Sequence, residues 1–71
     1  MPNTNLVCFA PGSKMSFNYT NDIGATRRRT IILESLAFGQ TIHHPEPQWF
    51  LNGYDVEQQE RRTFALKYVV L

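Results

Sequence analysis

The alternation of polar and apolar residues from Lys14 to Thr20 constrains the fold more than any other feature of the sequence. Met15, Phe17 and Tyr19 fall on one side of this pattern, and the polar residues between them fall on the other. A period of two that continues over the whole segment indicates a half-buried β-strand. We therefore expect this segment to be a strand with one face on the core and the other in solvent.

Further strands are predicted along the rest of the chain. Residues 26–33 are predicted to run antiparallel to the first strand, with their basic first half at the sheet rim and their β-branched second half in the core. Residues 34–42 are ambiguous between a third strand and an irregular crossover, because a glycine interrupts them. The other candidates are residues 6–10, 48–56 and 62–66, with residues 67–71 as a final strand or a terminal turn.

Turn sequences recur every ~8–12 residues, and no long amphipathic helix is predicted. Pro11-Gly12 and Asn21-Asp22-Ile23-Gly24 are the clearest of these turns. We therefore expect an all-β fold, a small barrel or rolled sheet of about five short antiparallel strands. Closing the sheet into a barrel would also protect the strand edges of so small a protein.

Size and charge narrow the classes of function. The 71 residues suit a single domain, with residues 1–13 as a leading strand or tail, and leave too little chain to wall a deep catalytic cleft. The net charge of +1 gives no overall signal for a polyanionic partner. Cys8 is the only cysteine, which excludes an intramolecular disulfide and predicts a cytoplasmic location. No apolar run approaches the ~20 residues of a membrane span, so no membrane association is expected.

Three segments of the second half form a recognisable series. Trp49-Phe50-Leu51, then Gly53-Tyr54-Asp55, then Arg62-Thr63-Phe64-Ala65-Leu66 resemble the signature of the WYL domain. Tyr19 and Arg29-Thr30-Ile31-Ile32 are similar to its first two strands, so the resemblance covers about residues 14 to 70. Three positions depart from the family pattern: Phe50 replaces a tyrosine, Leu33 a proline, and Tyr68 a basic residue.

The resemblance implies a small Sm- or SH3-like β-barrel of bacterial or phage origin. In that family the barrel acts as a regulatory module that senses nucleic acids or nucleotide-like ligands through basic and aromatic residues. Most members carry a DNA-binding winged helix ahead of the barrel. About thirteen residues precede the matching region, so we expect a free-standing domain without a helix-turn-helix.

Arginines are the first candidate ligand-binding groups. Arg27 and Arg29 share one face of the predicted second strand, with Arg28 opposite, so the two guanidinium groups can clamp a phosphate. The alternative is a solvated basic strand end that protects a sheet edge from aggregation. The resemblance places Arg29 and Arg62 at matching family positions, with a phosphate between them.

Aromatic side chains are the second candidate group, either as stacking platforms for bases or as part of the core. Trp49 and Phe64 are expected in the core. For Tyr19 and Tyr54, the sequence is compatible with either a core position or a role in ligand binding. The candidate binding residues are therefore Tyr19, Arg27, Arg29, Tyr54 and Arg62. The signature residues expected to be mainly structural are Trp49, Phe50, Leu51 and Phe64.

Catalysis, cofactors and metals are not expected. No serine–histidine–carboxylate order, glycine-rich phosphate loop or pair of catalytic carboxylates occurs. His43 and His44 lack ligand-pair spacing with Glu46 or Cys8, and we expect them to lie in a rigid loop that leads into the following strand.

The leading hypothesis is a regulatory module that binds a single-stranded nucleic acid or a nucleotide through its arginine and aromatic surface. The alternative is a protein–protein interaction module without affinity for nucleic acid. Its partner would be a second copy of the chain or a separate DNA-binding protein, because a small sheet leaves edges and apolar surface to cover.

Overall fold

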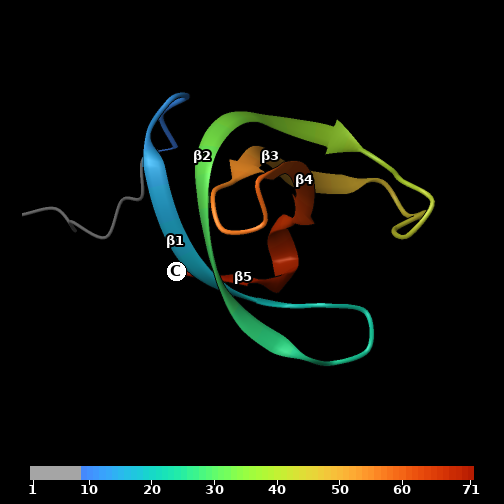
Figure 1. Ribbon diagram of the computed structural model, residues 1–71. Helices are drawn as coiled ribbons and strands as arrows, with labels where there is room; N and C mark the ends of the chain where they lie inside the picture. The colour runs from blue at the N-terminus through green and yellow to red at the C-terminus, as the bar shows by residue number, and fades with distance from the viewer. Residues whose placement is uncertain (1–8) are drawn as a thin grey trace, which may run out of the picture.

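The computed structural model describes residues 9–71, which form one antiparallel β-sheet (Figure 1). Its elements are β1 (Lys14–Thr20), β2 (Thr26–Gly39), β3 (Gln48–Asp55), β4 (Glu60–Ala65), the 3-10 turn η1 (Leu66–Tyr68) and β5 (Val69–Val70). The strands lie side by side in the order β4-β3-β2-β1-β5, as an open sheet. The prediction of an all-β fold with five antiparallel strands is confirmed. The strand predicted at residues 6–10 lies mostly outside the described residues, and residues 9 and 10 are not in a strand.

The β1–β2 hairpin follows directly from the sequence. Phe17 and Tyr19 face the core, as the alternation predicts. The side-chain oxygen of Asn21 accepts hydrogen bonds from the backbone N–H groups of Ile23 and Ala25, each at 3.0 Å, and so shapes the turn. Gly24 has φ +85°, a left-handed conformation that glycine adopts without steric cost. The hairpin therefore closes with the turn chemistry that its residues favour.

Strand β2 is much longer than the prediction for residues 26–33, and it absorbs most of the ambiguous segment that follows. Its first half pairs with β1 and its second half with β3. The pairing register with β3 shifts between Leu33 and Ser35, which marks a bulge at Glu34. Bulges bend a strand, and β2 curves through its length in Figure 1. Through this bend, β2 pairs with β1 along its first half and with β3 along its second half.

The core is a small cluster of apolar side chains from four strands. Its fully or nearly buried members are Phe17, Tyr19, Ile31, Leu33, Leu51 and Phe64. The rings of Phe17 and Phe64 meet edge to face at 5.2 Å between centroids, and those of Tyr19 and Phe64 at 4.9 Å. Such T-shaped contacts add to the stabilisation from burial. The prediction that Phe64 lies in the core is confirmed.

The prediction that Trp49 lies in the core is wrong. Its side chain is 52% exposed and packs edge to face on Phe38, itself 59% exposed, with 5.3 Å between ring centroids. The two residues pair across β3 and β2 near the loop end of that ladder, beyond the side chains of the core. The neighbouring Phe50 and Leu51 are buried instead.

Arg29 and Asp55 form the one buried ion pair among residues 9–71. Arg29 is 9% exposed and Asp55 is fully buried, with 3.5 Å between Arg29 Nη1 and Asp55 Oδ2. The other oxygen, Asp55 Oδ1, accepts hydrogen bonds from the backbone N–H groups of Glu57 and Gln58 at 3.0 and 3.1 Å. The prediction of a rim position holds for the exposed Arg27 and Arg28 but is wrong for Arg29, which lies opposite Phe17 in the register.

We expect Gly53→Ala to destabilise the domain by about 1–3 kcal/mol, the usual cost of overpacking a core. A Cβ at this position would lie 2.7 Å from Ile31 Cδ1 and 2.9 Å from the backbone oxygen of Ile32. Urea denaturation followed by far-ultraviolet circular dichroism measures the change. Gly39→Ala is the matched control, because its Cβ meets nothing within 4 Å. Equal losses for the two variants would contradict the prediction.

Asp55→Ala should cost about 3–5 kcal/mol of unfolding free energy, because it leaves the Arg29 charge buried without its partner. The same variant removes the acceptor of two turn N–H groups. Asp22→Ala removes an exposed carboxylate, and we expect a change within about 0.5 kcal/mol. Thermal denaturation of both variants tests the difference, and a loss below about 1 kcal/mol for Asp55→Ala would show that the buried pair is not needed for folding.

Candidate functional site

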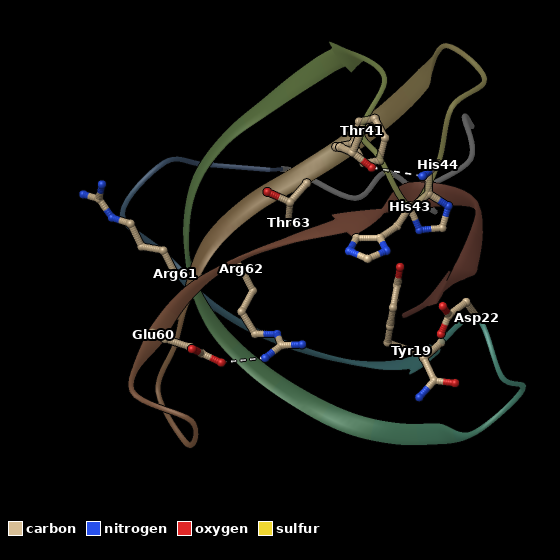
Figure 2. Close-up of a pocket in the computed structure, with 11 residues that line it drawn as sticks. Tyr19, Asp22, Thr41, His43, His44, Glu60, Arg61, Arg62 and Thr63 are labelled. Atoms are coloured by element: carbon tan, nitrogen blue, oxygen red, sulfur yellow. Dashed lines mark hydrogen bonds and ion pairs between the residues drawn. The ribbon is translucent and has the colours of Figure 1, made fainter.

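A cleft of about 490 Å³ lies along the edge strand β4, between the end of β1 and the loop that joins β2 to β3. Figure 2 shows side chains from these three segments directed toward a common space. The residues that line the cleft are Tyr19, Asn21, Asp22, Thr41, His43, His44, Phe50, Glu60, Arg61, Arg62 and Thr63. Side chains alternate along a strand, so the four consecutive residues of β4 that line the cleft project from both faces of that strand.

Arg62 is the cation at the centre of this cleft. Its Nη1 lies 2.6 Å from Oε2 of Glu60, two residues earlier on the same face of β4. The two side chains are 38% and 55% exposed, so water reaches both partners. Arg61 points away from the cleft in Figure 2 and pairs with Glu34, with 3.1 Å between Nε and Oε2. Arg62 is therefore the arginine whose guanidinium is directed into the cleft.

Tyr19 forms part of the cleft wall through its ring. The residue is 8% exposed, and its hydroxyl oxygen accepts a hydrogen bond from the backbone N–H of Ala65 at 3.1 Å. Burial raises the pKa of the Tyr19 hydroxyl, so the side chain stays a neutral phenol at physiological pH. The ring can contact a planar ligand at its exposed rim, while the hydroxyl oxygen is engaged with the backbone.

The two histidines enter the cleft from the β2–β3 loop. Thr41 and His44 close a tight turn with reciprocal backbone hydrogen bonds of 2.9 and 3.2 Å, and the Thr41 hydroxyl accepts a further bond from His44 N–H at 3.0 Å. The His44 ring lies 6.0 Å from the Phe50 ring and 5.9 Å from the Tyr68 ring, between centroids. Because the segment is a turn, both His43 and His44 line the same cleft. The sequence predicts only a rigid loop for these residues, because no local signal shows over which strand a loop folds.

The structure brings together some of the predicted binding residues and separates the others. Tyr19 and Arg62 line the cleft, and the signature residue Phe50 lies beside them. Arg27 is the cross-strand neighbour of Tyr19, on an exposed part of β2. Arg29 is buried against Asp55, and neither Arg29 nor Arg27 lines the cleft that contains Arg62.

Tyr54 lies apart from the cleft. It is 38% exposed and pairs in register with Ile32 on one side and Arg61 on the other. Its side chain projects from the face of β3 opposite to that of the buried residues Gly53 and Asp55.

A second, smaller hollow of about 320 Å³ continues from the cleft along β4 and shares Arg61, Arg62 and Thr63 with it. Its wall is a polar ladder across three strands. Thr63 donates a hydrogen bond to the Asn52 side-chain oxygen at 2.8 Å, and the Asn52 amide donates to the Ser35 hydroxyl at 3.2 Å. The surface of the second hollow is therefore polar, and it adjoins the cleft at the residues that line both.

The groups that line the cleft can bind an anion next to aromatic rings. A guanidinium and two imidazoles supply donors for phosphate or carboxylate oxygens, and the rings of Tyr19 and Phe50 supply flat apolar surface. Within residues 9–71, no three His, Cys, Asp or Glu side chains come close enough to hold a metal ion. No helix in the same range is long and apolar enough to cross a membrane.

Comparisons of this chain with protein-family models, with curated proteins and with solved structures find no match.

Proposed function

We propose that the protein is a small regulatory module that binds a phosphate-bearing ligand, a single-stranded nucleic acid or a nucleotide, in the cleft beside β4. The observation that carries the proposal is the position of Arg62, with its guanidinium in a cleft lined also by His43, His44 and the ring of Tyr19. A phosphate takes hydrogen bonds from the guanidinium, and a base packs on the aromatic wall. The polar ladder of the second hollow offers amide and hydroxyl groups to a longer ligand.

We also propose that the sheet is a partly open form of the Sm- or SH3-like barrel of a WYL domain. The strand order supports this proposal, because η1 carries the chain from one sheet edge, β4, to the opposite edge, β5. Tyr19 on β1 accepts a hydrogen bond from Ala65 at the end of β4, which joins the two sides. In this proposal the module acts in the cytoplasm and regulates transcription with a separate DNA-binding protein.

Fluorescence anisotropy with a labelled single-stranded oligonucleotide tests the ligand. We expect binding that weakens steeply as salt rises, because each phosphate contact releases counterions. Arg62→Ala should lower the affinity about tenfold and reduce the salt dependence by about one phosphate contact. Competition with a nucleoside monophosphate shows whether one nucleotide is enough to fill the cleft.

Arg28→Ala is the matched control, because it removes the same charge from an exposed site that does not line the cleft. We expect it to lower the affinity no more than about twofold, through long-range electrostatics alone. Flat titrations of the native protein at low salt would overturn the proposal. Equal losses in the two variants would instead mean that binding is diffuse and does not use the cleft.

The exposed pair of Phe38 and Trp49 favours a second candidate function, a protein–protein interaction module. Both rings are more than half exposed, at 59% and 52%, and contact each other outside the core. Contiguous aromatic surface of this kind is typical of interfaces.

For this second candidate, we expect self-association that Trp49→Ser abolishes without a loss of thermal stability above about 1 kcal/mol, because the side chain lies outside the core. Light scattering over a range of protein concentrations measures the mass, with Ile23→Ser as the control. Ile23 is 84% exposed in the β1–β2 turn. A native protein of 8.2 kDa at every concentration would exclude self-association and leave only a foreign partner.

A further inference from the structure

The carboxylate of Glu60 already occupies a hydrogen-bonding position on the cleft arginine. Its Oε2 lies 2.6 Å from Nη1 of Arg62, in the same cleft. Figure 2 shows the two groups joined on the cleft side of β4. A phosphate oxygen would approach this guanidinium in the same way, since carboxylate and phosphate both take its N–H donors.

The spacing of the two residues fixes this arrangement. Residues two apart on a strand project from the same face, so Glu60 and Arg62 are neighbours whenever β4 forms. The pair is nevertheless weak, because both side chains remain open to water. A ligand with more negative charge than one carboxylate can therefore displace Glu60 without breaking any part of the fold.

The other charged groups of the cleft do not duplicate this contact. Arg61 lines the cleft, but its guanidinium points away from it and pairs with Glu34, and Asp22 makes no ion pair among the described residues. His43 and His44 lie on the opposite wall, in the β2–β3 loop. The availability of Arg62 thus depends on Glu60 alone among the carboxylates of the described chain.

We propose that Glu60 is an internal competitor that lowers the affinity of the cleft for phosphate-bearing ligands. This inference rests on the proposed function and adds its regulation: the ligand competes with the Glu60 carboxylate for the Nη1 donor of Arg62. Displaced from Arg62, the carboxylate turns to solvent, and the strand keeps its backbone pairing with β3. Weak binding that is sensitive to one side chain suits a sensor, which must release its ligand when the concentration falls.

Glu60→Gln tests the inference, because the amide keeps the shape of the side chain and removes its charge. Two probes are used: a labelled single-stranded oligonucleotide in anisotropy, and inorganic phosphate in a nuclear magnetic resonance titration of the Arg62 side-chain N–H. Glu57→Gln is the matched control, since it removes the same charge from an exposed position in the β3–β4 turn that does not line the cleft. A double-mutant cycle, measured by oligonucleotide anisotropy, adds Arg62→Ala alone and together with Glu60→Gln.

We expect Glu60→Gln to tighten the binding of both probes about threefold to fivefold, and Glu57→Gln to change it less than twofold. The gain should disappear in the Arg62→Ala background. Equal gains in the two glutamine variants, or weaker binding by Glu60→Gln, would overturn the inference; the latter would show that Glu60 positions Arg62 for its ligand.

The two proposals fail separately. If the native protein binds the oligonucleotide and Glu60→Gln binds it no tighter, the proposal that Glu60 competes with the ligand is wrong and the proposed function stands. If neither protein binds the oligonucleotide but Glu60→Gln binds inorganic phosphate more tightly than Glu57→Gln does, the proposal that Glu60 competes for Arg62 stands. The proposal that the ligand is a nucleic acid is then wrong. If no variant responds to either probe, both proposals are wrong.

Discussion

The buried pair of Arg29 and Asp55 is the interaction on which the rest of the structure depends. The Asp55 carboxylate contacts Arg29 in the first half of β2 and also accepts hydrogen bonds from two N–H groups of the turn that precedes β4. It thereby fixes the direction in which the edge strand leaves β3. Arg62 and Glu60 lie on that edge strand, so the geometry of the cleft follows from a contact outside it. A buried pair of this kind adds little stability while intact, but losing either partner is costly.

The parts of the fold that depend on short-range pattern could be predicted from the sequence. Alternation gave β1 and the faces of Phe17 and Tyr19, because one residue in two is buried wherever a strand covers a core. The bulge at Glu34 could not be predicted, since no proline or glycine marks it and the register between β2 and β3 is a long-range property of the two strands. The prediction of a core position for Trp49 is wrong because the ladder of β2 and β3 extends past the core. The residue pattern of a strand does not show at which residue the core ends.

The candidate site was predictable only in its strand residues. Tyr19 and Arg62 project from strands whose faces follow from periodicity. His43 and His44 enter the cleft because a turn held by Thr41 folds over β4, and that is a long-range contact without a local sequence signal. Arg29 is a candidate ligand-binding residue from the sequence alone. Neighbouring residues along the chain do not distinguish an arginine that pairs with a buried carboxylate from one that binds a phosphate. Only the position of Asp55 separates the two roles.

The exposed position of Trp49 has a consequence for spectroscopy. It is the only tryptophan of the chain, and it lies next to Phe38 at the loop end of the β2–β3 ladder, away from the aromatic cluster of the core. Its emission therefore reports on the polarity around that end of the hairpin. Because Trp49 is already 52% exposed in the fold, unfolding changes its surroundings less than it would for a buried tryptophan. In this protein, intrinsic fluorescence therefore reports mainly on one end of the sheet.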